Sequence, residues 1–318
     1  MHRLKRFQIT LIITTLIFSP AICRADMTLA LNQGFVKTYK DKATITTKFH
    51  VDAHPKREHD IGEGSNDGDI HMGGRDNVIL LPLVAEIVNA KMEADTKQFL
   101  LQTTAGQEVD VTGMWRIWFE HPPTGEDQVQ GQNVPPPEDS NPDHLFELHP
   151  LTEFAGFNCL DSFLPIVDNT SSPPKKFKAY DASIAFPYYE AREATIKKSD
   201  TAIMITSRKA VYNYVDFVMK LAGKPKDVGD GYIVPAKIFA SGDTDDPIVG
   251  INRRMIFAKG SPPADAVRDL VKGDFLHVLG IPRVNLNKVF AIASHLNDGE
   301  EYSDALPYEM IIVAILPG

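Results

Sequence analysis

Cysteine, tryptophan and long apolar runs are all scarce in this sequence. Its 318 residues include two cysteines and two tryptophans. Cys23 lies in an N-terminal segment that we expect to be removed, so Cys159 would have no partner and an intramolecular disulfide is excluded. We interpret Cys159 as a small buried apolar side chain rather than a catalytic thiol. After that segment, no apolar run is long enough to span a bilayer as a helix.

Positive charge is also in short supply. The chain has 33 lysine and arginine residues against 42 acidic residues, and its net charge is −9. Non-specific binding to a polyphosphate depends on counterion release by basic side chains, and an acidic chain gains little from it. The charge balance therefore disfavours non-specific nucleic-acid binding. A small molecule, an oligosaccharide or a protein is the expected partner.

Residues 1–25 have the pattern of an export signal. Ile9 to Phe18 is apolar apart from threonines, it follows a basic start, and small residues precede a predicted cleavage after Ala25. Cleavage would give a periplasmic or secreted protein without a membrane span. It would remove four basic residues, which changes the net charge from −9 to −13; they are Arg3, Lys5, Arg6 and Arg24. The alternative is a lipoprotein anchored at Cys23, although Ile22 is bulky where a small residue is expected.

The length favours two domains, and the residue pattern predicts mainly β structure with short helices. The predicted organisation is a signal peptide (1–25), an OB-like domain (26–158), a linker (159–180) and a second domain (181–318). A loop rich in proline, glycine and acids (121–143) interrupts the first domain. The second domain is predicted to be α+β, with derivation from an OB barrel as one option.

Hydrophobic periodicity predicts the order of elements in the first domain. Strands are expected over 43–51, around 69–72, over 78–88, over 109–119 and from Phe146 onward, with a short helix over 97–103. Three strands, a helix and two more strands form the order of a five-stranded OB barrel. The Pro-rich loop then joins the last two strands, where OB barrels carry a ligand-binding loop.

The second half is predicted to contain two helices and several strands. Helical spacing of Val211, Tyr214, Val215 and Val218 predicts a helix over 211–221, and Ser261 with Pro262 predicts the start of another. Strands are expected over 202–206, 232–240, 254–258, 275–293 and 310–316. The segments 111–117 and 278–284 share the pattern V-x-G-[MI]-x-R-[IV], which suggests a tandem duplication. The helix over 211–221 is the main argument against it.

Four short motifs carry a resemblance to a known family. They are Asp67–His71 (DGDIH), Val84–Ile87 (VAEI), Val111–Gly113 (VTG) and Phe146–Pro150 (FELHP). Together they resemble exported bacterial proteins of uncharacterised function that carry an OB-like domain. The likeness covers roughly residues 40–155 and implies an OB barrel there, but no activity.

A narrower resemblance is to staphylococcal-nuclease-like OB barrels, in which an Asp-Gly-Asp-Thr turn supplies a calcium ligand. Asp69 would match that ligand, but Ile70 stands where the threonine is expected. The Asp-x-Pro-Glu motif that supplies a second ligand and the general base is also missing. The resemblance therefore gives little support to a nuclease of that mechanism.

The candidate ligand-binding residues lie on three predicted strands. Asp67, Asp69 and His71 occupy alternate positions, so their side chains are expected on one face, and Glu147 and His149 share a parity in a later strand. Arg116 and Trp118 complete the set. Trp115 and Trp118 have opposite parity, so we expect one in the core and the other, Trp118, at a surface where it could stack on a ligand.

Asp69, His71, Glu86 and His149 form a candidate site for a divalent metal. Their mixture of oxygen and nitrogen donors suits zinc or manganese better than calcium. The alternative is structural: the aspartates form a turn, the histidines bond to the backbone, and Glu86 pairs with Arg116. A carboxylate within the apolar run 80–88 needs a cation beside it or a wet face. Arg283 is expected to pair similarly with an acid that the sequence does not identify.

Three functions fit this pattern. The leading hypothesis is an exported binding or interaction protein whose ligand lies near Asp69, His71, Trp118 and His149, beneath the Pro-rich loop. The alternative is a metal-dependent hydrolase, similar to a phosphodiesterase, in which Asp69, His71, Glu86 and His149 hold the metal that activates water. A structural subunit of an envelope complex is the third hypothesis.

Overall fold

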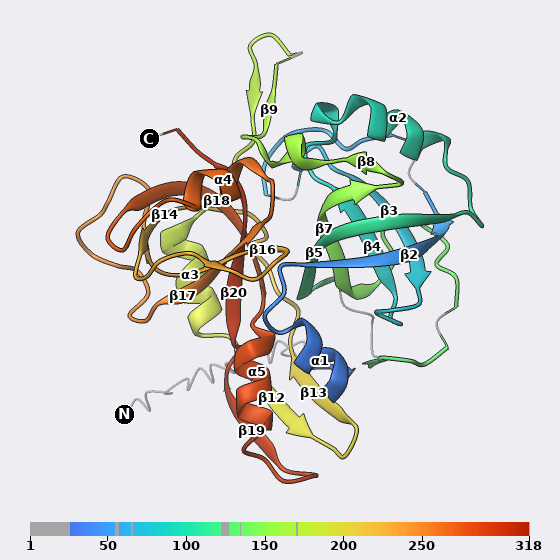
Figure 1. Cartoon of the computed structure of the whole chain (residues 1–318), viewed down its shortest axis with the longest axis vertical. Coiled ribbons are helices and arrows are strands. Elements are labelled where there is room, and N and C mark those ends of the chain that lie inside the picture. The colour runs from blue at the N-terminus through green and yellow to red at the C-terminus, as the bar shows by residue number, and fades with distance from the viewer. Residues whose placement is uncertain are drawn as a thin grey trace, which may run out of the picture.

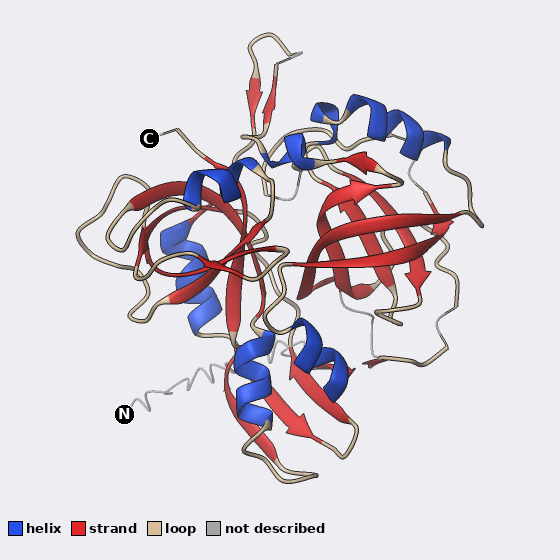
Figure 2. Cartoon of the chain, in the orientation of Figure 1, coloured by secondary structure: helices blue, strands red, loops and turns tan. Residues whose placement is uncertain are grey.

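The computed structural model describes residues 26–54, 57–64, 66–121, 127–133, 135–169 and 171–317. The predicted signal peptide lies outside these residues. Figure 1 shows two rounded β structures side by side, with a smaller layer of strands and two helices next to both. The expected fold class, mainly β with short helices, is confirmed (Figure 2).

The first barrel closes through five strands. They are β2 (Thr44–Ala53), β3 (Ile70–Asp76), β4 (Leu83–Ile87), β5 (Glu108–His121) and β7 (His144–Phe154). The strands pair in the ring β2–β3–β4–β7–β5–β2, and only the pair β4–β7 is parallel. Helix α2 (Ala94–Gln102) lies between the third and fourth strands in sequence. This is the strand order of an OB barrel, as the sequence predicted.

The second barrel has the same strand order. Its strands are β14 (Val215–Leu221), β16 (Gly231–Phe239), β17 (Arg253–Ala258), β18 (Phe275–Val284) and β20 (Tyr308–Ile315). They pair in the ring β14–β16–β17–β20–β18–β14, with β17–β20 parallel. Helix α4 (Pro262–Val267) again lies between the third and fourth strands, and Ser261 caps it by accepting from the Ala264 amide. The second half therefore contains an OB-type barrel as well.

A separate five-stranded sheet joins segments from distant parts of the chain. Its order is β19 (Glu301–Ala305), β12 (Glu193–Lys198), β13 (Ala202–Ser207), β1 (Met27–Asn32) and β6 (Gln128–Val129). Helices α1 (Gln33–Tyr39) and α5 (Leu286–Ala293) contact each other beside it. The Pro-rich loop thus contributes one short strand, and the sheet includes residues from both predicted domains.

The remaining short elements lie within the barrels or between them. They are η1 (Ala90–Met92), β8 (Phe157–Asn158), η2 (Leu160–Phe163), β9 (Val167–Asp168), β10 (Lys175–Lys176), β11 (Tyr180–Asp181), α3 (Ala182–Glu190) and β15 (Lys226–Asp227). Strands β9 and β10 form a hairpin that projects from the molecule (Figure 1). The predicted linker therefore has some regular structure of its own.

Three predicted elements are wrong in type or extent. The segment predicted as a helix over 211–221 is strand β14, whose Val215, Phe217 and Met219 are buried at alternate positions between β16 and β18. The strand predicted over 275–293 ends at Val284, and α5 follows it. The strand predicted over 78–88 is reduced to β4.

The fourth strands of the two barrels, β5 and β18, pack against each other. Both carry the shared sequence pattern. In each barrel, the arginine of this pattern pairs with a glutamate on the adjacent fifth strand. Arg116 lies opposite Glu147, and their side-chain atoms Nη1 and Oε2 are 2.5 Å apart. Arg283 lies opposite Glu309, with Nε 2.8 Å from Oε1. The acid that the sequence left unidentified is therefore Glu309.

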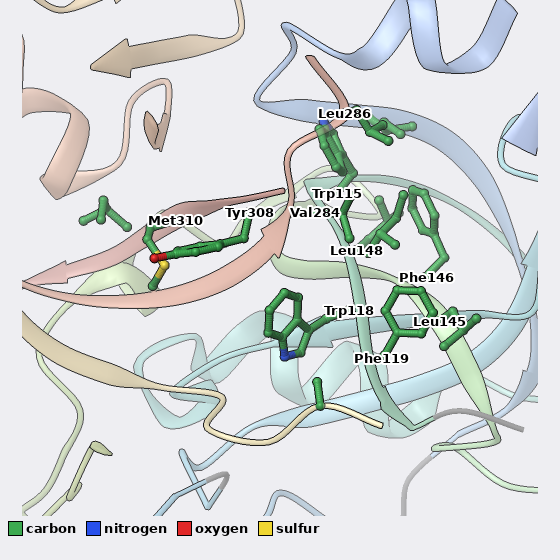
Figure 3. Close-up of a cluster of buried hydrophobic side chains, with 14 of the residues drawn as sticks. Trp115, Trp118, Phe119, Leu145, Phe146, Leu148, Val284, Leu286, Tyr308 and Met310 are labelled. Carbon is green, nitrogen blue, oxygen red and sulfur yellow. The ribbon is translucent and has the colours of Figure 1, made fainter. Parts of the chain in front are cut away.

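Each arginine also bonds to the backbone of the other barrel. Arg116 Nε donates to the Pro282 carbonyl at 3.0 Å, and Arg283 Nη1 donates to the Trp115 carbonyl at 3.0 Å. Each acceptor is the residue just before the other arginine. Both guanidinium groups are fully buried, and the Arg283 group lies 3.5 Å from the centre of the Trp115 ring. Figure 3 shows this part of the interior, with Trp115 and Trp118 inside the molecule.

Candidate functional site

A cluster of buried acids and histidines lies where the first barrel meets the segment that enters β14. Its members from the first barrel are at most 7% exposed; they are Asp67, Asp69, His71, Glu86, Glu147 and His149. They come from the turn before β3 and from β3, β4 and β7. Burial of so many ionisable groups is costly unless they are paired, so their contacts decide what the site can do.

The turn before β3 brings two aspartates and a histidine together. Gly68 has φ of +72°, and a Cβ there would lie 2.8 Å from Ile61, so glycine is needed at this position. Ile61 forms a bridge with Asp67, and the His59 amide donates to the Asp69 carbonyl at 2.8 Å. This antiparallel contact places His59 beside Asp69.

A hydrogen-bonded chain crosses from one barrel to the other. Glu86 Oε2 lies 2.9 Å from His149 Nδ1, and His149 Nε2 lies 2.8 Å from the Tyr214 hydroxyl. That hydroxyl donates to Asp67 Oδ2. Tyr214 directly precedes β14, so the second barrel completes a polar chain that begins in the first. Carboxylate, imidazole, phenol and carboxylate follow one another in this order.

A second set of contacts surrounds Arg116. Its guanidinium pairs with Glu147 and with Glu120, the latter at 3.0 Å, and donates to Asn213 Oδ1 at 2.8 Å. His144 Nε2 lies 2.9 Å from the other Glu147 oxygen. The expected pair between Arg116 and Glu86 is therefore wrong. The strands that carry Arg116 and Glu147 are direct neighbours, so these two side chains pair. Glu86, on β4, pairs with His149 instead.

Burial and pairing shift the pKa values of these groups in opposite directions. Burial raises the pKa of Asp67 well above its usual range, and Asp69 adds to the effect. Burial opposes ionisation of Glu86, but the charge and hydrogen bond of His149 lower its pKa to about 2. Burial also opposes a charge on His149, yet Glu86 and Glu147 raise its pKa well above the usual value. The cluster thus favours an ionised Glu86 beside a protonated His149.

A small polar cavity of about 150 Å³ opens onto this cluster. Five carboxylates line it: Asp67, Asp69, Glu86, Glu120 and Glu147. His59, His121, His149, Asn66, Asn141, Asn213 and Tyr214 complete the lining. Because the acids outnumber the groups that carry positive charge, the cavity suits a cation or a small polar molecule.

His71 lies in a neighbouring cluster with His59 and Asp69. One donor atom from each of the three residues lies within 4.8 Å of the others. His59 Nδ1 is 2.9 Å from Asp69 Oδ1, and this carboxylate raises the pKa of His59. Imidazole nitrogens and a carboxylate oxygen are suitable ligands for a zinc-like ion.

The Pro-rich segment covers β3 next to this cluster. His71 Nδ1 lies 2.9 Å from the Ser140 carbonyl, and Asn141 lines the cavity. A Cβ at Gly73 would lie 2.5 Å from the Asp139 carbonyl, so the loop backbone lies directly against the strand. The loop therefore fixes one side of the site.

The predicted site residues form three groups in the structure: those at the cavity, those of the predicted metal site, and Trp118. Asp67, Asp69, Glu147 and His149 line the cavity, with Arg116 bonded behind it. Of the predicted metal set, Asp69 and His71 approach each other together with His59, whereas Glu86 and His149 pair with one another.

Trp118 lies elsewhere and is 2% exposed, so its expected exposed position is wrong. Its ring packs edge-on against Tyr189, with centroids 5.5 Å apart, and Arg192 lies 5.8 Å from its centre. Trp115 is buried too. Both faces of β5 are covered, one by the barrel interior and the other by the second half of the chain, which strand parity alone does not reveal.

The sequence reasoning missed the contributions of His59, Glu120, Asn213 and Tyr214. Tyr214 belongs to the segment that the sequence predicts as a helix over 211–221, and His59 belongs to none of the motifs described above. The one available signal was the position of His59 before the Asp-Gly-Asp turn, since such a turn can fold the chain back on itself.

The fold and the site define a protein with two OB-type barrels and a polar cavity beside their junction. No family model and no curated protein matches the sequence. None of the helices in the described part of the chain has both the length and the apolar character that a membrane crossing needs.

Among solved structures, the wild-type single-stranded DNA binding protein from Thermus aquaticus is similar to this chain. It is 11% identical, with 86% of this chain and 93% of that chain covered and a TM-score of 0.21. A deletion mutant of the same protein is 10% identical, with 87% and 95% covered and a TM-score of 0.21. At such low values, neither match indicates what this chain binds.

Proposed function

We propose that this protein is a binding protein, not an enzyme, and that it holds a small cation in the polar cavity beside the barrel junction. The supporting observation is the excess of buried carboxylates over positive groups around a space of about 150 Å³. Pockets for organic ligands typically have volumes of about 300–1,000 Å³. The cavity therefore suits an ion or a very small molecule better than an organic substrate.

The chain Glu86–His149–Tyr214–Asp67 supports binding across the two barrels. Its groups satisfy each other without a ligand, so the cavity walls are already ordered. Ordered walls reduce the conformational cost of binding. A cation would add positive charge to a cavity whose lining holds five carboxylates.

The proposal is tested by calorimetric titration of the full chain with potassium, methylammonium, magnesium, calcium, manganese and zinc ions. We expect at least one of these cations to bind with one-to-one stoichiometry and to raise the melting temperature. Glu86→Gln, checked for folding by circular dichroism, should weaken that binding. Because Glu86 is buried, Glu120→Gln provides a second variant at a more exposed lining acid.

Glu63→Gln is the matched control, because the exposed side chain of Glu63 pairs with Lys178 and does not line the cavity. It should leave the affinity unchanged. Absence of binding by every cation in the series would contradict the proposal. A labelled single-stranded oligonucleotide in the same titration tests the expectation from net charge, which predicts no binding.

A metal-dependent hydrolase is the second candidate. The observation that favours it is the hydrogen-bonded series of Glu86, His149 and Tyr214, since a carboxylate–imidazole pair can move a proton during hydrolysis. Cleavage of bis(p-nitrophenyl) phosphate with added zinc or manganese, lost in His149→Gln, would replace the binding proposal with this one.

A further inference from the structure

His71 has one ring nitrogen in use and the other free. Its Nδ1 lies 2.9 Å from the Ser140 carbonyl, and a carbonyl oxygen can only accept a hydrogen bond. Nδ1 is therefore the protonated nitrogen, and Nε2 carries the lone pair. Nε2 is buried and has no hydrogen-bond partner in the described part of the chain. A buried imidazole with an unused lone pair is costly in a protein interior unless a ligand satisfies it.

The free nitrogen belongs to the cluster with His59 and Asp69. The three donor atoms lie within 4.8 Å of each other, and tetrahedral zinc with bonds near 2.1 Å needs donors about 3.4 Å apart. The required movement is small, and His59 can supply it because its side chain is 47% exposed. Asp69 and His71 are held by buried backbone at the start of β3.

The arrangement also resembles known metal sites in how the ligand is held. A metal-bound histidine typically donates its other nitrogen to a carbonyl or carboxylate, which fixes the ring and the tautomer. The Ser140 carbonyl occupies that position for His71. The contact between His59 and Asp69 pairs two of the three side chains without a metal. It leaves His71 Nε2 without a hydrogen-bond partner among the described residues.

We infer that His59, Asp69 and His71 form a binding site for a zinc-like divalent metal ion, which deepens the proposed function by naming its cation and rests on it. Two imidazoles and one carboxylate match the preferences of zinc and its neighbours, whereas calcium and magnesium prefer all-oxygen sites. Three protein ligands leave a coordination position for water or for a second ligand. Asp69 and His59 also line the cavity, so the ion would lie at its edge.

The test uses the full chain after removal of metals with a chelator. Calorimetry with zinc chloride should show one ion per chain, and calcium and magnesium should bind at least about a hundredfold more weakly. Cobalt(II) should give the intense visible absorption of a low-coordinate site with nitrogen ligands. His59→Ala and His71→Ala should each weaken zinc binding by about tenfold or more.

His277→Ala is the matched control. His277 lies 2.6 Å from Asp216 in the second barrel, so it belongs to a similar histidine–aspartate pair, but one that lacks a third donor among the described residues. It should leave zinc binding unchanged. His59→Ala replaces a half-exposed side chain, so this variant keeps the test decisive if His71→Ala fails to fold.

Three results would overturn the metal site: no stoichiometric zinc binding, equal binding of calcium, or equal losses in His59→Ala and His277→Ala. The two proposals can fail separately. Cation binding that Glu86→Gln abolishes and His59→Ala leaves intact would overturn the metal site alone. Zinc binding that depends on His59 and His71 but not on Glu86 would support the metal site and overturn the role that the proposed function gives to Glu86.

Discussion

His149 has carboxylates at one ring nitrogen and a phenol at the other. Glu86 and Glu147 lie 2.9 Å and 3.4 Å from Nδ1, and the Tyr214 hydroxyl lies 2.8 Å from Nε2. A protonated imidazole donates at both nitrogens, so this setting stabilises the charged form. The ionised Glu86 and the charged His149 therefore depend on each other in a buried environment.

The pKa of Glu86 predicts how the stability of the protein depends on pH. The folded value of about 2 lies below the ordinary value of 4.5, so Glu86 contributes stability above pH 4.5 and loses it as the pH falls towards 2. The contribution near neutral pH is on the order of 3 kcal/mol. Urea unfolding should show Glu86→Gln less stable than wild type at pH 6, with a gap that shrinks to roughly two fifths at pH 3.

Glu63→Gln should show almost no gap at either pH, because surface ion pairs contribute little. A Glu86→Gln gap that stays constant or grows towards low pH would contradict the assignment of an ionised Glu86 beside His149.

Part of this site could be predicted from single residues. The alternation of Asp67, Asp69 and His71 predicts polar groups together at the start of β3, and the shared parity of Glu147 and His149 predicts a polar face on β7; in the barrel, β4 lies between these two strands. Tyr214 could not be predicted, since it is 147 positions from Asp67 and reaches it only through the contact between barrels. The partner of Arg116 could not be predicted either, because it depends on the register of β5 against β7.

At the level of elements, helix α5 shows how a local signal outweighs a longer pattern. Leu276, Val278, Val284 and Leu286 suggested one alternating strand. The buried residues after Val284 are instead Leu286, Val289 and Ala293, which follow helical spacing. Asn285 accepts from the Lys288 amide at 2.9 Å and so caps the helix. The capping residue Asn285 can be read from the sequence, but the alternation of apolar residues around it favoured a strand.

Asn285→Ala should therefore destabilise the protein by about 1 kcal/mol, because the helix loses its N-terminal cap. Chemical unfolding measures this difference. Asn285→Ser keeps a side-chain acceptor and should recover most of the loss. Equal stability of the alanine and serine variants would contradict a capping role.

Strand β14 illustrates the reverse case. The spacing of Val211, Tyr214, Val215 and Val218 fits a helix, but β-branched and aromatic residues also favour strands. The choice between them depends on β16 and β18, which pair with β14 on its two edges. The sequence of the segment does not contain that information.

At the scale of the whole molecule, the two barrels repeat the same arrangement. The shared pattern occupies the fourth strand of each, and its arginine pairs with a glutamate on the fifth strand. The predicted helix that argued against a duplication is a strand of the second barrel. These features support a duplication, which stays a hypothesis about the origin of the chain.

Because these arginines are buried and ion-paired where the barrels meet, replacing one of them should lower the free energy of unfolding substantially. Arg283→Met would leave the fully buried Glu309 with a weaker set of partners, and removal of one member of a buried ion pair typically costs about 3–5 kcal/mol. The double variant with Glu309→Gln should cost less than the sum of the two single variants. Unfolding by urea, followed by tryptophan fluorescence, measures these differences.

Arg268→Met is the control, because Arg268 is half exposed and pairs with Asp265 at the surface. It should change the stability by less than about 1 kcal/mol. If Arg283→Met cost no more than this control, the junction would not depend on its buried charges.

The reciprocal bonds of Arg116 and Arg283 also bear on the order of assembly during synthesis. The carbonyl that accepts from Arg116 belongs to β18, and the acid that neutralises Arg283 belongs to β20, which leaves the ribosome later still. The outer side of β5 in the first barrel therefore lacks this cover until β18 is made, and Arg283 lacks its glutamate until β20 follows. A nascent chain paused before β18 is the species in which that side of β5 would be open to a chaperone.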